Sequence, residues 1–104
     1  MSEVIYKYTL QRVTSILFYA ELPKNAKIIN IGNQNNSLVI WAICDPNDKE
    51  RFELKKYYYN IYFTGQIKDK FEGTYIKTLV LYGDELVIHI FKVEDDSKYK
   101  YYEN

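Results

Sequence analysis

An apolar run between two turn signals constrains the fold of this chain most. Residues 38–44 (Leu-Val-Ile-Trp-Ala-Ile-Cys) are apolar at every position, which is the pattern of a strand buried on both faces. A polar stretch at 34–37 precedes the run. Asp45-Pro46 ends it, because proline has no N–H to donate to a sheet. The sequence therefore predicts a compact β domain that contains this strand.

Alternation of apolar and polar residues dominates the rest of the chain, and no segment sustains the apolar stripe of a helix. Strands are expected at 4–8, 15–20, 26–31, 38–44, 51–63, 74–82 and 85–93. The last two form a hairpin, with Gly83-Asp84 as a two-residue turn. The predicted fold is mainly β, with about seven antiparallel strands in a small sandwich or partial barrel. At most one short helix is expected, at 47–58, where the alternative is a strand.

The length of 104 residues indicates a single domain. We expect it to cover 1–93, followed at 94–104 by a charged, tyrosine-rich C-terminal tail that frays or docks through Tyr99, Tyr101 and Tyr102. The N-terminus does not resemble a signal peptide, and no apolar stretch approaches the roughly 18 residues that span a bilayer. Cys44 is the only cysteine and gives no disulfide framework. A cytoplasmic protein without membrane attachment is therefore expected.

Charge and aromatic content narrow the range of partners. Fourteen basic and 14 acidic residues leave no formal net charge, which disfavours binding to duplex nucleic acid. Twelve tyrosines are the compositional outlier. They reflect either the codon bias of an AT-rich genome or surfaces that become half-buried, such as a subunit interface or a stacking pocket.

Single residues suggest binding more than catalysis. His89, the only histidine, is either a half-buried hydrogen-bonded residue or a ligand contact. Trp41 either fills the core or offers a stacking platform. Thr64-Gly65 is either a plain turn or an anion-binding loop. Arg12 and Arg51 are the only arginines and are candidates for phosphate contacts, with plain surface placement as the alternative.

Motifs for chemistry are missing from the sequence. One cysteine and one histidine cannot supply the three or four nitrogen or sulfur ligands of a zinc site, so neither a metal nor a cofactor is expected. We find no glycine-rich phosphate loop, paired acid motif or nucleophile elbow. The sequence therefore predicts a protein that is not an enzyme.

Several short motifs follow one another in order along nearly the whole chain. They are Ile5–Tyr8, Leu22–Ile28, Gln34-Asn35, Leu38–Ala42, Asp45-Pro46, Thr64-Gly65, Tyr75–Thr78 and Leu86–Phe91. Together they resemble a family of small phage and prophage proteins known only as a domain of unknown function. The chain departs from that family at Gln66-Ile67, where His-Pro is usual, and at Ile88, where Trp is common.

The resemblance implies a phage accessory protein, and it makes the family a candidate for sequestering cyclic nucleotides that signal infection in the host cytoplasm. Such a ligand needs a pocket of about 300–1,000 Å³, which we expect between the subunits of a dimer or tetramer. The expected ligand-binding residues are Trp41, Tyr8 and Tyr57 for stacking, Arg12 and Arg51 for phosphates, and Thr64, Gly65 and His89 for polar contacts. The alternatives are a protein–protein inhibitor of a host defence effector and a virion structural or assembly protein, with a hydrolase last.

Overall fold

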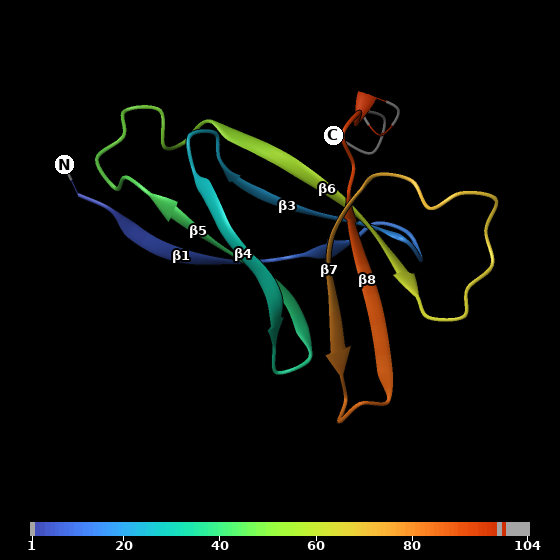
Figure 1. Cartoon of the computed structure of the whole chain (residues 1–104). Coiled ribbons are helices and arrows are strands. Elements are labelled where there is room, and N and C mark those ends of the chain that lie inside the picture. Colours follow the sequence, from blue (N-terminus) through green and yellow to red (C-terminus); the bar gives the residue numbers. More distant parts are fainter. Residues whose placement is uncertain (1, 98, 100–104) are drawn as a thin grey trace. The chain divides into compact units, whose positions relative to one another are not determined.

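The structure, a computed structural model, describes residues 2–97 and 99. It contains eight strands in two antiparallel sheets and, within those residues, no α-helix (Figure 1). The strands are β1 (Val4–Thr9), β2 (Gln11–Arg12), β3 (Leu17–Pro23), β4 (Lys27–Gln34), β5 (Ser37–Cys44), β6 (Leu54–Phe63), β7 (Thr74–Leu81) and β8 (Leu86–Lys92). The prediction of a mainly β, antiparallel fold is confirmed.

The strand order is β1-β5-β4 in one sheet and β2-β3-β6-β8-β7 in the other. By their contacts the residues group into two compact units. Unit 1 comprises 1–11 and 20–57, and unit 2 comprises 12–19 and 58–104. Strands β3 and β6 each contribute one part to each unit. The division into a domain over 1–93 and a tail over 94–104 stays a prediction.

In unit 1, β5 is the central strand of the three-stranded sheet. It pairs with β1 on one side and β4 on the other, so that Trp41 lies opposite Lys7 and Asn30. Val39 and Ile40 are adjacent in sequence and therefore point to opposite faces, and both are buried. The expected strand with two buried faces is thus present. The tight turn before it places Asn35 and Asn36 at positive φ (51° and 64°), which asparagine tolerates.

The segment between β5 and β6 forms consecutive turns, in place of the short helix or the strand from residue 51 that the sequence predicts. Asp48 organises them: its Oδ1 accepts a hydrogen bond from the Glu50 N–H (2.9 Å), and its carbonyl accepts one from the Arg51 N–H (3.1 Å). An aspartate side chain that bonds to nearby backbone in this way favours a turn over a helix. The strand therefore begins at Leu54 and not at 51.

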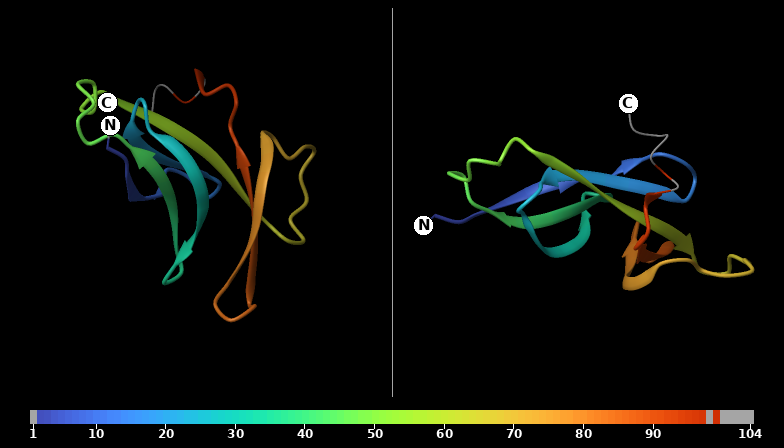
Figure 2. Two further views of the ribbon diagram at one scale, coloured as in Figure 1. Left: turned by 60° about the vertical axis from the view of Figure 1, so that its left-hand side comes forward. Right: turned by 90° about the horizontal axis from the view of Figure 1, so that it is seen from above.

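In unit 2, β8 lies between β6 and β7, and the views of Figure 2 show β7 and β8 side by side. Their connection differs from the predicted two-residue turn. Leu81 pairs with Leu86, so residues 82–85 form a four-residue turn. Tyr82, Gly83 and Asp84 all have positive φ (54°, 61° and 75°). The turn therefore contains two residues more than predicted, Tyr82 and Glu85 in addition to Gly83-Asp84.

Two strands that end a sheet carry a register irregularity. In β4 it falls between Ile28 and Asn30, and in β7 between Tyr75 and Lys77. The intervening residues, Ile29 and Ile76, are exposed. An extra residue of this kind leaves part of the strand unpaired and bends it locally.

Tyrosines build much of the core of unit 2. Leu17, Tyr58 and Val93 form a buried cluster, and the Val93 N–H donates to the Tyr58 carbonyl (3.0 Å). The ring of Tyr99 packs against this cluster, with 5.4 Å between its centroid and that of Tyr58. Tyr101 and Tyr102, which were also expected to dock, lie outside the described residues.

Two glycines of the loop between β6 and β7 provide a matched test of how closely this loop packs against β8. Gly73 has φ +104°, and a Cβ there would lie 2.5 Å from the Lys92 carbonyl oxygen. Gly65 has φ +88° with no atom within 4 Å of such a Cβ. We expect Gly65→Ala to lower the free energy of unfolding by about 1–2 kcal/mol, the cost of a left-handed conformation. Gly73→Ala should cost clearly more, because the methyl group also meets the β8 backbone.

Urea denaturation of the two variants measures the difference in free energy. Equal losses would contradict the contact between Gly73 and β8.

Candidate functional site

A cavity of about 630 Å³ lies within unit 2, and we name it the loop cavity. Its lining comes from the segment before and into β3, from β6, from the loop between β6 and β7, and from Tyr99. The residues are Thr14, Ile16, Leu17, Asn60, Tyr62, Ile67, Lys68, Asp69, Lys70, Glu72 and Tyr99. The volume falls within the range of small-molecule sites, so a ligand-sized space exists inside one unit of one chain.

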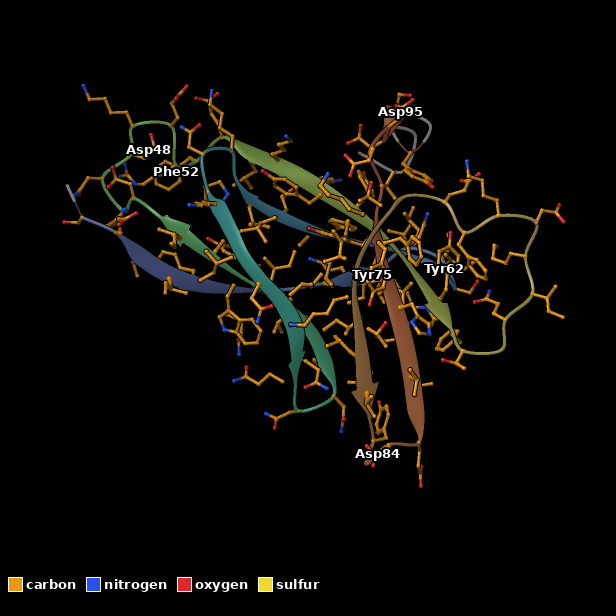
Figure 3. All side chains as sticks on the ribbon, viewed as in Figure 1. Asp48, Phe52, Tyr62, Tyr75, Asp84 and Asp95 are labelled. Atoms are coloured by element: carbon orange, nitrogen blue, oxygen red, sulfur yellow. The ribbon has the colours of Figure 1, made fainter. Side chains whose placement is uncertain are left out.

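Tyr62 holds the loop that walls this cavity. It lies on β6 (Figure 3) and is 3% exposed. Its hydroxyl accepts a hydrogen bond from the Glu72 N–H (3.1 Å) and lies 3.5 Å from the Glu72 carbonyl oxygen. Its ring makes edge contacts with Phe71 (4.9 Å between centroids) and Phe91 (5.3 Å). The end of loop 64–73 (yellow in Figure 1) is therefore tied to β6.

The same loop brings charge to the cavity. Lys68 and Lys70 both line it, and the Lys68 ammonium lies 5.6 Å from the centroid of the Tyr62 ring. Asp69 lies between them in sequence and also lines the cavity. Two ammonium groups give an anion two partners, while the carboxylates of Asp69 and Glu72 offset their combined field. The site is therefore suited to local contacts with an anion more than to long-range attraction.

One of the residues that line the cavity is polar and buried. Asn60 is 6% exposed and sits between Tyr59 and Ile61, which are both buried. A buried amide costs free energy unless its donors and acceptor find partners. An amide that lines a cavity can meet those partners on a ligand, and it offers both a donor and an acceptor.

Three of the predicted site residues come together, but outside the loop cavity. The Thr64 hydroxyl is hydrogen-bonded to Nε2 of His89 (2.8 Å), and Gly65 follows with φ +88°. Nδ1 of His89 bonds to the Thr78 hydroxyl (2.8 Å), which bonds in turn to the Tyr75 hydroxyl (2.7 Å). Both ring nitrogens of His89 therefore have a threonine hydroxyl as hydrogen-bond partner.

The predicted stacking residues belong to unit 1. Trp41 is half-buried and packs near Gly32, where an added Cβ would lie 3.3 Å from the indole ring. The Tyr8 hydroxyl lies 3.4 Å from Sγ of Cys44. Burial, and then this hydrogen bond, raises the pKa of Tyr8 above its usual range. The ring of Tyr57 has the Lys55 ammonium 5.0 Å from its centroid.

The two arginines have local partners. Arg51 stacks on Phe52, with 4.5 Å from its guanidinium carbon to the ring centroid, and donates to the Asp48 carbonyl (3.1 Å). It lines a cavity of about 240 Å³ in unit 1, on the loop where Figure 3 labels Asp48 and Phe52. Arg12 donates from Nε to the Thr14 carbonyl (3.0 Å) and is exposed. Neither lines the loop cavity.

Sequence reasoning missed the residues that line the loop cavity. Tyr58, Asn60 and Tyr62 alternate along β6 and so share one face, and that alternation was a signal of a common environment. Lys68 and Lys70 belong to the charged run Lys68-Asp69-Lys70, which gives no indication of what the loop covers. The signal was incomplete because the cavity joins residues from Thr14 to Tyr99, which only the fold brings together.

Two searches of the described residues bear on other kinds of site. Across 2–97 and 99, no three or more histidine, cysteine, aspartate or glutamate side chains gather as a metal ion would require. In the same residues there is no helix with the length and apolar character needed to cross a membrane.

A family defined as a domain of unknown function, DUF7352, matches residues 1–100. The chain belongs to the DUF7352 family. No curated protein and no solved structure matches the chain. The expected membership of a family of unknown function is thus confirmed, while phage origin stays a prediction.

The role of Tyr62 in this DUF7352 domain is testable by removing one hydroxyl. Tyr62→Phe keeps the ring contacts and deletes the bond to Glu72, worth about 0.5–1.5 kcal/mol. We expect trypsin to cleave faster after Lys68 and Lys70, because the loop opens more often. Tyr57→Phe, which removes a hydroxyl from the same strand but away from the loop, is the control. Unchanged cleavage in Tyr62→Phe would show that the hydroxyl does not restrain the loop.

Proposed function

We propose that this chain is a non-enzymatic binding protein that sequesters a small nucleotide, such as a cyclic dinucleotide or a related immune signal, in the cytoplasm of a phage-infected bacterium. The observation that carries the proposal is the loop cavity, in which aromatic rings, an amide and two lysines line one space. Nucleotides combine a flat base with phosphate groups. Each of these parts has a matching partner among the lining residues.

The base would be held by stacking. Tyr99 lines the loop cavity and is half-buried, and stacking of a base on an aromatic side chain contributes about 1–3 kcal/mol. Asn60 adds a neutral hydrogen bond of about 0.5–1.5 kcal/mol. These contacts are independent of the phosphate and select for a planar, polar ring.

The phosphate would be held by the loop. Lys68 and Lys70 offer charge-assisted hydrogen bonds of about 1.5–3 kcal/mol each. Together with one stacked base and the amide, the favourable terms reach about 5–10 kcal/mol before the cost of association. A nanomolar dissociation constant needs about −12 kcal/mol. We therefore keep a homo-oligomer, a dimer or tetramer, as part of the proposal, because a second copy would add contacts to each ligand.

A thermal shift experiment tests the binding. Purified protein is heated with a panel of cyclic dinucleotides and mononucleotides, and the released ligand is then identified by mass spectrometry. We expect the Tm to rise by roughly 10 °C at a ligand concentration about 100 times Kd and the ligand to be recovered intact. If no nucleotide shifts the Tm, the proposal is overturned. If cleaved products are recovered, the protein is an enzyme and the proposal of a non-enzymatic binder is wrong.

Three variants test where the phosphate binds. Lys68→Gln/Lys70→Gln should weaken binding at least tenfold, since two charge-assisted contacts are lost. Asp69→Asn should tighten it, because a negative charge leaves the wall of an anion site. Lys27→Gln/Lys49→Gln removes the same charge from exposed positions outside the cavity and serves as the control. Equal binding by all variants in a calorimetric titration would exclude the loop cavity as the site.

A second candidate, a protein–protein inhibitor of a host defence effector, is favoured by the surface of β7. Four large apolar or aromatic side chains on or next to this strand are exposed: Tyr75, Ile76, Val80 and Tyr82. Exposed apolar side chains that cluster on one element often mark a protein interface. This candidate predicts a stoichiometric protein partner and no response to nucleotides.

A further inference from the structure

A second cavity, of about 240 Å³, adjoins the loop cavity within unit 2, and we name it the tail cavity. It shares Asn60, Glu72 and Tyr99 with the loop cavity. The rest of its lining is Gly73, Val93, Glu94 and Asp95. The two cavities are thus neighbours, with three lining residues in common.

The two cavities differ in charge. Both lysines belong to the loop cavity alone, while Glu94 and Asp95 belong to the tail cavity alone. Carboxylates only accept hydrogen bonds, whereas ammonium groups only donate them. A ligand that fits both cavities therefore carries an anionic group at one end and hydrogen-bond donors at the other.

Asn60 is an independent sign of a polar ligand at the division between the cavities. Its side chain is more than nine-tenths buried, and it makes no hydrogen bond through its amide to any residue of 2–97 or 99. In that part of the chain, every side-chain nitrogen or oxygen that is fully buried has a hydrogen-bond partner. The Asn60 amide has none there, so its atoms are not fully buried and are in contact with the cavity space. A buried amide in this position has its donors and acceptor ready for a ligand.

The two carboxylates of the tail cavity have partners on neighbouring residues of the chain. Oδ1 of Asp95 accepts hydrogen bonds from the backbone N–H (3.1 Å) and the hydroxyl (2.8 Å) of Ser97. Glu94 has the Lys92 ammonium at 3.9 Å. Asp95 lies on the segment that follows β8, as Figure 3 shows. Since Ser97 fixes Asp95 through one oxygen, the carboxylate has a defined orientation.

We propose that the nucleotide bound at this site is a guanine nucleotide, with its base in the tail cavity and its phosphate at the loop lysines. The inference rests on the proposed function and names the ligand class for that site. Guanine is the common base whose one edge presents two adjacent donors, the ring N1–H and the exocyclic 2-amino group. A carboxylate accepts both, and the Asn60 amide can donate to O6. Adenine presents an acceptor at N1, which a carboxylate repels.

Three mononucleotides that share sugar and phosphate test the inference. Calorimetric titration of the full chain compares GMP with IMP, which lacks the 2-amino group, and with AMP. We expect GMP to bind about 10- to 100-fold more tightly than either, the effect of a hydrogen bond to a charged group. Equal affinities for the three would overturn the inference and leave the proposed function intact. If neither these mononucleotides nor the cyclic dinucleotides of the thermal shift panel bind, both the inference and the proposed function are overturned.

Two variants assign the preference to the tail cavity. Glu94→Gln/Asp95→Asn keeps the size of both side chains and the Oδ1 acceptor for Ser97, but removes both negative charges. It should lower the preference for GMP over IMP, because the 2-amino group loses its charged acceptor, and it should weaken IMP to a smaller extent, because IMP keeps the N1–H donor. Asp84→Asn removes a charge at the tip of the β7–β8 hairpin (Figure 3), where asparagine also tolerates positive φ, and should keep the preference. A preference that survives the double variant would place the base elsewhere and overturn the inference.

Discussion

Five consecutive buried residues on β6, Tyr58–Tyr62, set the constraint on which unit 2 depends. Successive side chains on a strand point to opposite faces, so this run needs cover on both. Strand β8 pairs with one edge of β6, the Ile16 carbonyl accepts from the Ile61 N–H on the other edge, and the cluster around Leu17 and Val93 covers part of one face. Tyrosine suits such a strand because its ring packs while its hydroxyl reaches a polar partner.

The loop between β6 and β7 exists in its present form because of that strand. The Tyr62 hydroxyl needs a partner and finds the backbone of Glu72, and its ring collects Phe71 and Phe91. These contacts satisfy a buried polar atom, and they also decide where Lys68 and Lys70 lie. The core and the candidate site are therefore two results of one set of contacts.

The sequence predicted what depends on local pattern. The alternation of apolar and polar residues gave the fold class, and the uninterrupted apolar run gave the central strand β5. It did not predict the turns after β5, because Asp48 bonds to its own neighbourhood in competition with a helix. The four-residue turn after Leu81 was missed because its length follows from the pairing of β7 with β8.

The expected site residues do not coincide with the loop cavity. Thr64, Gly65 and His89 were expected to make polar contacts with a ligand, which stays a prediction, and the pairing of β6 with β8 brings Thr64 to His89. The other five expected residues have partners elsewhere, and none of the eight lines the loop cavity. The residues that line this cavity lie far apart in the sequence and follow no common periodicity. Their proximity therefore follows only from the fold.

The two register irregularities, in β4 and β7, bear on the proposed sequestration. A binder that removes its ligand one for one must accumulate in amounts comparable to that ligand. Abundant β proteins risk joining through exposed sheet edges into aggregates or fibrils. Distorted strands at those edges make poor templates for a further strand. The irregularities at Ile29 and Ile76 thus make two of the four edge strands, β4 and β7, poor templates for a further strand.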